Sequence, residues 1–331
     1  MHSFKKWVMF ASLAAAIALS HTAKAQDLDS MMGASTNQFS DNVDVACGVL
    51  TKANCALVLP KIAHYSVPQG VTISPIESHG SLQSAEAVCK GIIQSAIGQM
   101  DAFSLVENST ACASSFQQIG SPLYPYYGYL VVLASNPANS MDDLVNNVQQ
   151  GQTLNVADGK MGSGGQVTFQ ALLAADPNWK RVVAESDEDQ DSALGNLSDG
   201  TLDAYFVMDG PGSALVSTIK NSVDKNGNKV YKFLDISPDS SFFNELDFNG
   251  KPLYQSLILK SGWFIDTHTI STNAVLIVNT SWANGQSWGS NPADSNSTQA
   301  VNVLRQAQDQ AEAAIMASTL TPPNWTGSVG Q

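Results

Sequence analysis

The chain has 331 residues, of which 44% are hydrophobic and 14% are charged, and its formal net charge at pH 7 is −13. An acidic field of this size repels nucleic acid and anionic lipid, so the charge argues against a nucleic-acid-binding protein and against binding to an anionic membrane surface. The length is sufficient for two domains that each bury a hydrophobic core.

Residues 1–25 have the pattern of a secretory signal peptide. Lys5 and Lys6 precede the apolar run WVMFASLAAAIALS, and the small-residue pattern Ala-Lys-Ala ends at Ala25. The run is shorter than the ~20 apolar residues of a membrane-spanning helix, although a retained anchor is the alternative. We therefore expect cleavage after Ala25 and export to the periplasm. Cleavage removes three lysines and no acidic residue, which changes the net charge from −13 to −16.

The sequence has four cysteines, Cys47, Cys55, Cys89 and Cys112. An even number of cysteines in an exported chain predicts two disulfides. There is no Cys-x-x-Cys motif, and the histidines lack the spacing of metal ligands, so we expect no structural zinc site or other metal site. No sequence feature implies a cofactor.

Residues 43–127 alternate between strand and helix signals. The helix predicted over 81–98 has an apolar face formed by Leu82, Ala85, Val88, Ile92, Ile93 and Ala96. Strands are predicted at 43–49, 70–78 and 100–107, with helices at 53–66 and 81–98. This alternation indicates a parallel sheet with right-handed crossovers.

The stretch at 121–137 has a different character. Two prolines and four tyrosines between Pro122 and Tyr129 lead into an apolar strand. We interpret this segment as a crossover between two lobes.

After the crossover the same alternation begins again. A helix capped by Ser140 spans 140–151, and the last helix, at 298–318, has one apolar stripe of Val301, Leu304, Ala307, Ala311 and Ile315. Between them we predict strands at 152–159, 180–186, 202–212, 229–237 and 268–279, helices at 162–175, 189–200 and 213–223, and a hairpin turn at 224–229. The predicted organisation is a first lobe at 43–127, a second lobe at 128–232, a return to the first lobe at 233–318 and a tail at 319–331.

Two glycine-serine turns precede predicted helices. The first, SHGSLQSAE, begins at Ser78 and contains His79, Gly80 and Ser81. A helix N-terminus offers unpaired N–H groups and the positive end of the helix dipole, and glycine allows a ligand to approach the backbone. The alternative is an ordinary serine cap with nothing bound. His79 is as consistent with the surface as with the cleft.

The second turn repeats this arrangement with Ser163, Gly164, Gly165 and Gln166. Two such turns on opposite lobes could hold a carboxylate without an arginine fork. This matters because the chain after residue 25 has only two arginines, at 181 and 305, and we interpret both as structural.

Four sequence blocks together resemble the TAXI-type solute receptors of tripartite ATP-independent periplasmic (TRAP) transporters. In chain order they are ISPIESHGSLQSAEAVCKGIIQSAIGQMDAF, NVADGKMGSGG, LSDGTLDAYFVMDGPG and TISTNAVLIV, which span roughly residues 70–280. The sequence departs from this family at 47–55, where CGVLTKANC replaces a glycine-rich loop followed by aromatic residues.

The resemblance implies a two-lobed α/β periplasmic binding protein of type II topology. It also implies that Gln99 lies near the ligand; in the sequence, Gln99 and Asp101 separate the predicted helix from the next strand. Asp209 ends a predicted strand, where ligands of open α/β sheets bind. The alternative is that Asp209 is only part of a simple Pro-Gly turn.

The implied function is capture of a small polar solute, a carboxylate or an amino acid, for delivery to the permease subunits of a membrane transporter. We expect a monomer that binds no nucleic acid. A receptor of an ABC importer is the alternative within the same class, and an exported hydrolase is the alternative from another class. The motif GQSWG at 285–289 matches a nucleophile elbow, but no strand-turn-helix context is predicted there and no histidine follows Ser287.

Four cysteines allow three pairings. If the first strand lies between the second and the third, right-handed crossovers place the two intervening helices on opposite faces of the sheet. Cys55 in the first helix can then reach Cys47 but not Cys89, which leaves Cys89 for Cys112. This strand order predicts the pairs Cys47–Cys55 and Cys89–Cys112.

Overall fold

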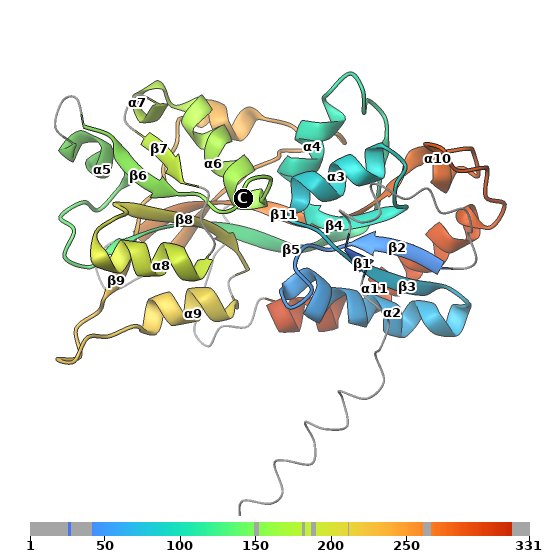
Figure 1. Cartoon of the computed structure of the whole chain (residues 1–331), viewed down its shortest axis with the longest axis horizontal. Helices are drawn as coiled ribbons and strands as arrows, with labels where there is room; N and C mark the ends of the chain where they lie inside the picture. Colours follow the sequence, from blue (N-terminus) through green and yellow to red (C-terminus); the bar gives the residue numbers. More distant parts are fainter. Residues whose placement is uncertain are drawn as a thin grey trace, which may run out of the picture.

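The computed structural model describes residues 26–27, 42–148, 152–180, 183–186, 190–210, 212–260 and 266–319. These residues form two α/β lobes side by side, joined by two long strands (Figure 1). The predicted signal peptide at 1–25, Arg181 and the tail from residue 320 lie outside the described residues.

The first lobe is built on a sheet with the order β3-β2-β4-β11-β5. The strands β2 (Asn42–Ala46), β3 (Thr72–Glu77) and β4 (Ser95–Gln99) are parallel, and β2 pairs with both of the others. The first strand therefore lies between the second and the third. The short β1 (Gln26–Asp27) extends the edge beside β3.

The second lobe repeats this order as β7-β6-β8-β5-β9. Its parallel strands are β6 (Leu154–Ala157), β7 (Val183–Ser186) and β8 (Ala204–Asp209), with β9 (Tyr231–Leu234) on the far side of β5. In the first lobe, β11 from the C-terminal part of the chain lies next to β4. In the second lobe, β5 from the N-terminal part of the chain lies next to β8. This order is the type II topology, so the predicted fold class is confirmed.

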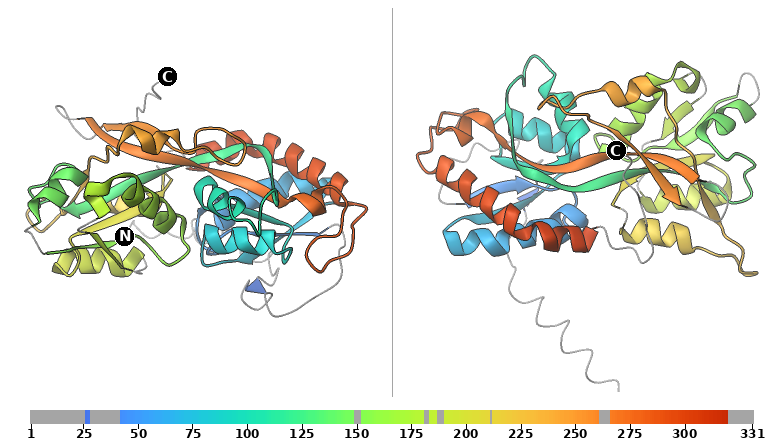
Figure 2. Two further views of the ribbon diagram at one scale, coloured as in Figure 1. Left: turned by 90° about the horizontal axis from the view of Figure 1, so that it is seen from above. Right: turned by 180° about the vertical axis from the view of Figure 1, so that it is seen from behind.

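Two antiparallel strands connect the lobes. β5 (Phe116–Leu133) has 18 residues and β11 (Asp266–Asn279) has 14, and the two pair along Ser271–Asn279. Both run along one side of the molecule, past both lobes (Figure 2). β10 (Gln255–Lys260) pairs with the start of β11 and carries no clear signal in the sequence.

Helices cover the sheets of both lobes. In the first lobe they are η1 (Asn54–Val58), α2 (Leu59–Ser66), η2 (Val67–Gln69), α3 (Ser81–Cys89), α4 (Met100–Glu107), α10 (Thr280–Ala283) and α11 (Ser297–Thr319). In the second lobe they are α5 (Met141–Asn147), α6 (Gly164–Ala175), α7 (Pro177–Lys180), α8 (Gln190–Asp199), α9 (Ala214–Asn221) and the 3₁₀ turn η3 (Ser240–Asn244).

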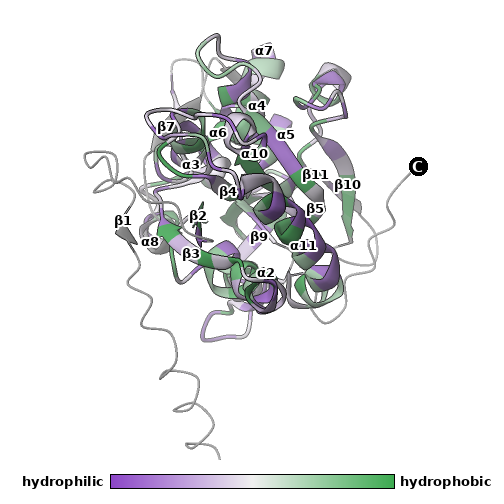
Figure 3. Ribbon diagram, turned by 90° about the vertical axis from the view of Figure 1, so that its right-hand side faces the viewer, coloured by the Kyte–Doolittle hydropathy of each residue, from purple (hydrophilic) through white to green (hydrophobic). Residues whose placement is uncertain are grey.

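Local sequence signals explain where several helices begin. Ser140, Ser163 and Ser213 each accept a hydrogen bond from the backbone N–H three residues later, which caps α5, α6 and α9. The predicted apolar stripe of α11 is buried, and the helix packs against β5 and α2. Hydrophilic and hydrophobic residues alternate along this helix (Figure 3).

The prediction for 81–107 is wrong in two places. The helix predicted over 81–98 ends at Cys89, and its last part is instead the strand β4. The predicted strand at 100–107 is the helix α4, so Gln99 ends a strand and Asp101 lies in the first turn of a helix. Gly91 (φ +67°) ends the first helix. The segment SAIGQ is buried at every position, and helical periodicity does not distinguish such a strand from a buried helix.

The lobe boundaries in the structure fall within shared strands. β5 belongs to both sheets, and β9 pairs with Leu130–Leu133 in the second lobe. The predicted boundary at 232 falls within β9, which is hydrogen-bonded to the strand that also pairs with β8.

The core continues from one lobe into the other on the side of α4 and α6. One apolar cluster includes Phe103 of α4 together with Phe169 of α6 and Phe206 of β8. Two further clusters fill the opposite face of each lobe separately. The lobes are thus joined by buried side chains as well as by strands.

The structure has two disulfides, Cys47–Cys55 and Cys89–Cys112, which is the pairing that the strand order predicts. Within the described residues, no helix combines the length and the hydrophobicity that a membrane crossing requires.

Candidate ligand-binding cleft

A cleft of about 710 Å³ lies between the lobes. Residues that follow the carboxyl ends of β2, β3 and β4 line it from the first lobe, and residues that follow β6 and β8 line it from the second. The volume falls within the ~300–1,000 Å³ of small-molecule sites. Ligands of open α/β sheets bind outside the carboxyl ends of the strands, so this is the position that the fold predicts for a ligand.

The disulfide loop forms one wall. Cys47, Gly48, Val49, Thr51, Lys52, Ala53 and Asn54 all line the cleft. The Cys47–Cys55 bond closes this loop at its base, and Ser78 supports it because the Ser78 hydroxyl accepts a hydrogen bond from the Gly48 N–H at 3.1 Å. The loop that departs from the resembled family is therefore held in place against the cleft.

Tyr126 of β5 lies at the back of the cleft and is tied to the same wall. Its hydroxyl is 2.7 Å from that of Tyr124, which donates to Asn54 Oδ1 at 2.6 Å. Burial raises the pKa of Tyr126 to about 12, so the phenol stays protonated at neutral pH. The crossover strand thereby presents a neutral aromatic side chain with a hydroxyl to the cleft.

Each lobe contributes charged side chains. Lys52 comes from the disulfide loop, while Asp158, Lys160 and Asp209 come from the ends of β6 and β8. Burial raises the pKa of Asp209, and the shift is opposed by hydrogen bonds from the Ser213 side chain and the Gly210 N–H and by the positive charge of Lys52. The lining therefore contains two lysines and two aspartates from facing walls.

Eight of the ten residues predicted to bind ligand line the cleft: His79, Gly80, Ser81, Gln99, Ser163, Gly164, Gly165 and Asp209. Ser78 and Gln166 are not among the lining residues. Ser78 is 1% exposed and bonds to Gly48 and Ser84, and the Gln166 side chain accepts from the Gly162 N–H at 2.7 Å. Both hold the backbone of the turns in place.

The two glycine-serine turns touch each other directly. The Leu82 N–H in the first turn of α3 donates to the Gly162 carbonyl at 3.1 Å. The Ser81 hydroxyl accepts from the Gln99 N–H at 3.1 Å, and the Ser163 hydroxyl accepts from the Gln166 N–H at 3.2 Å. The Leu82 N–H, at a helix start that the sequence offers to a ligand, is thus used between the lobes. Because the two turns touch each other, they border the cleft and do not enclose it from both sides.

A buried polar group lies next to this contact. Asp101 of α4 is 2% exposed, and its carboxylate accepts hydrogen bonds from the Ala102 N–H at 2.8 Å, from Tyr254 at 3.2 Å and from Thr168 of α6. Burial raises the pKa of Asp101 to about 6, and the three hydrogen bonds oppose the shift. A titratable group therefore links the two lobes.

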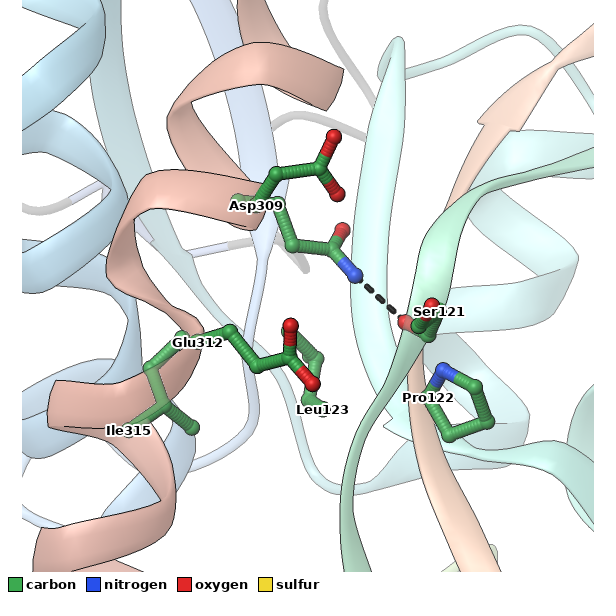
Figure 4. Close-up of a pocket in the computed structure, with 7 residues that line it drawn as sticks. Ser121, Pro122, Leu123, Asp309, Glu312 and Ile315 are labelled. Carbon is green, nitrogen blue, oxygen red and sulfur yellow. Dashed lines mark hydrogen bonds between the residues drawn. The ribbon is translucent and has the colours of Figure 1, made fainter.

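A second hollow, between α11 and β5, is much smaller, about 10 Å³, which is about the size of one water molecule (Figure 4). Ser121, Pro122 and Leu123 lie on one side of it, with Glu312 and Ile315 on the other. The Gln308 side chain donates to the Ser121 carbonyl there. This contact fastens the terminal helix to the crossover strand.

Sequence reasoning missed Lys52, Tyr126, Asp158 and Lys160 as cleft residues. Asp158 and Lys160 lie within NVADGKMGSGG, directly after a predicted parallel strand, which was a usable signal. Lys52 lies within CGVLTKANC, the segment that departs from the family pattern. Among the described residues, no group of three or more His, Cys, Asp or Glu side chains is placed to hold a metal ion.

Neither a protein-family model nor a curated protein sequence matches the chain. Solved structures with a similar fold include an amino acid ABC transporter substrate-binding protein from Streptococcus pneumoniae bound to L-arginine, with 13% identity, a TM-score of 0.44 and coverage of 85% of this chain and 97% of that one. The periplasmic aliphatic sulphonate binding protein of Escherichia coli has 13% identity and a TM-score of 0.42, with coverage of 85% of this chain and 75% of that one. The effector-binding domain of QuiR in complex with shikimate has 12% identity and a TM-score of 0.46, with coverage of 82% of this chain and 97% of that one.

Proposed function

We propose that this protein is an exported receptor that captures a small polar solute between its lobes and delivers it to a membrane permease. The observation that carries the proposal is the cleft of about 710 Å³ at the carboxyl ends of the strands of both lobes. A site shared by two lobes suits capture, because a ligand that contacts both stabilises the closed arrangement by its differential affinity for it.

The lining favours a solute with a carboxylate, and in particular an amino acid. Lys52 and Lys160 can pair with a carboxylate, and Asp209 can accept from an ammonium group. Tyr126 adds a hydroxyl and an aromatic face. A zwitterion satisfies both signs of charge, whereas a ligand of one sign leaves the opposite pair of side chains uncompensated in a confined site.

The predicted signal peptide and the two disulfides support a periplasmic location. The sequence blocks that resemble TAXI-type receptors favour a TRAP permease as the partner, and an ABC importer is the alternative. The genes that adjoin the coding sequence separate the two, because a permease of four plus twelve helices accompanies the first and an ATPase accompanies the second.

The experiment that tests the proposal identifies the solute and then measures its binding. Mass spectrometry of small molecules released from the purified protein should yield one polar carboxylate or amino acid in near-stoichiometric amount. Calorimetry with that compound should then show one site per chain.

Asp209→Asn should weaken this binding by about ten- to a hundredfold, because a hydrogen bond to a charged group contributes ~1.5–3 kcal/mol. Asp203→Asn, an exposed aspartate outside the cleft lining, is the matched control. Wild-type affinity in Asp209→Asn would remove this residue from the site, and turnover of an ester or amide panel would favour the hydrolase.

A further inference from the structure

Gly80 lies where the first lobe meets the second. A Cβ atom at this position would lie 2.6 Å from the Gly162 carbonyl oxygen and 2.7 Å from Ser163 Cα. The backbone of Gly80 is extended, with φ 160° and ψ −175°, and any residue can adopt that conformation. Glycine is therefore needed here for the close approach of the other lobe and not for a special backbone angle.

A backbone hydrogen bond crosses the same contact. The Leu82 N–H belongs to the first turn of α3, where helix N–H groups have no partner within the helix. It donates to the Gly162 carbonyl of the second lobe at 3.1 Å. This bond exists only while the lobes are together.

A second glycine contact lies beside the first. The Gln99 side chain covers Gly164, where a Cβ would lie 2.2 Å from Gln99 Cδ. Gln99 is 4% exposed, and its Oε1 lies 3.4 Å from the hydroxyl oxygen of Thr168. Gln99 thus acts as a contact between lobes as well as a residue of the cleft lining.

The third contact is the buried cluster of Asp101, Thr168 and Tyr254. It joins α4 of the first lobe to α6 of the second and to the segment before β10, and Phe103 and Phe169 belong to the apolar cluster around it. Separation of the lobes at this point would expose apolar side chains to water, so the apolar part of the contact favours the closed arrangement, whereas ionisation of the buried Asp101 carboxyl opposes it.

We propose that these three contacts, including the one at Gly80, form a clasp that holds the lobes closed on this side before any solute binds. As a device that governs solute capture the clasp rests on the proposed function, but its contacts lie within this chain and are tested without solute. An interface that is buried and partly apolar opposes the free lobe motion otherwise expected between two domains joined by a linker.

The test uses protein that has been unfolded in urea, separated from small molecules and refolded. Two readouts are measured: amide hydrogen exchange at Leu82 and the radius of gyration from small-angle X-ray scattering. In the wild type the Leu82 amide should be protected. Gly80→Ala should raise its exchange rate by about tenfold or more, and should increase the radius of gyration while the far-UV circular dichroism is unchanged.

Gly195→Ala in α8 is the matched control, because a Cβ there meets nothing within 4 Å, and both readouts should equal those of the wild type. Gly164→Ala should have a smaller effect than Gly80→Ala, because the end of the Gln99 side chain can turn aside whereas the backbone at Gly162 cannot. Wild-type exchange and radius in Gly80→Ala would overturn the clasp. If that variant does not fold, rapid unprotected exchange of Leu82 in the solute-free wild type would overturn it equally. Solute affinity enters neither readout, so failure of the clasp and failure of the proposed function are distinguishable.

Discussion

Replacement of Asp101 by asparagine should make the protein more stable at neutral pH. Burial raises the pKa of this carboxyl from 3.8 to about 6. One pKa unit corresponds to about 1.36 kcal/mol, so ionisation of Asp101 costs the folded state about 3 kcal/mol. The folded pKa lies above the unfolded one. The stability contributed by the neutral Asp101 carboxyl is therefore fully present below pH 3.8 and is lost as the pH rises through about 6.

Asparagine retains the shape of the neutral acid, and its carbonyl can accept from the Ala102 N–H. In the variant the Thr168 hydroxyl can turn its one proton from residue 101 to the Gly164 carbonyl, 2.9 Å away, so that its oxygen accepts from the asparagine amide. The expected gain in unfolding free energy at pH 7.5 is up to about 3 kcal/mol, and it should shrink toward zero at pH 4.

Urea unfolding of the wild type and of Asp101→Asn, at intervals between pH 4 and pH 8, measures this difference. The other carboxylates titrate in both proteins, so the difference between the two curves isolates Asp101. A variant that is less stable than the wild type at pH 7.5, or a difference that does not depend on pH, would refute the reasoning.

Three further outcomes are expected. Loss of Cys47–Cys55 to serines should cost about 2.5 kcal/mol of stability and loss of Cys89–Cys112 about 3.4 kcal/mol, from the chain entropy of rings with separations of 8 and 23 residues. Only the first should also weaken solute binding by calorimetry, because its loop lines the cleft; equal affinities would contradict this. Lys52→Met should lower the affinity for the solute by about ten- to a hundredfold. Lys61→Met, at a lysine outside the cleft lining, should leave the affinity unchanged, and equal losses in the two variants would point to general electrostatics. Ser163→Ala should cost ~1 kcal/mol in urea unfolding, because its hydroxyl caps α6; an unchanged midpoint would show that the cap is dispensable.

The sequence predicted the repeated strand-helix pattern of both lobes because strands at regular spacing and serine caps are local signals. Ser140 marks the start of α5 in both the sequence and the structure. The disulfide pairing also followed, since it depends only on which face of the sheet each crossover helix covers. By contrast, the segment 95–99 is buried at all five positions, and its apolar pattern had no period that separates strand from helix.

The site was predictable only where it follows a strand. Asp209 and the turn at Ser163 come after parallel strands and line the cleft. The contact of Gly80 with Gly162 was not predictable, because the two glycines belong to different lobes, lie some eighty residues apart in the chain and leave no local sequence pattern. For the same reason the Asp101 cluster, which requires side chains from three separate segments, was missed.

A crystal structure of the protein with the solute recovered from it tests the central claim most directly. The solute should lie in the cleft with its carboxylate near Lys52 or Lys160 and with hydrogen bonds to both lobes, including one to Asp209. A solute bound elsewhere, or held by residues of one lobe only, would contradict the account.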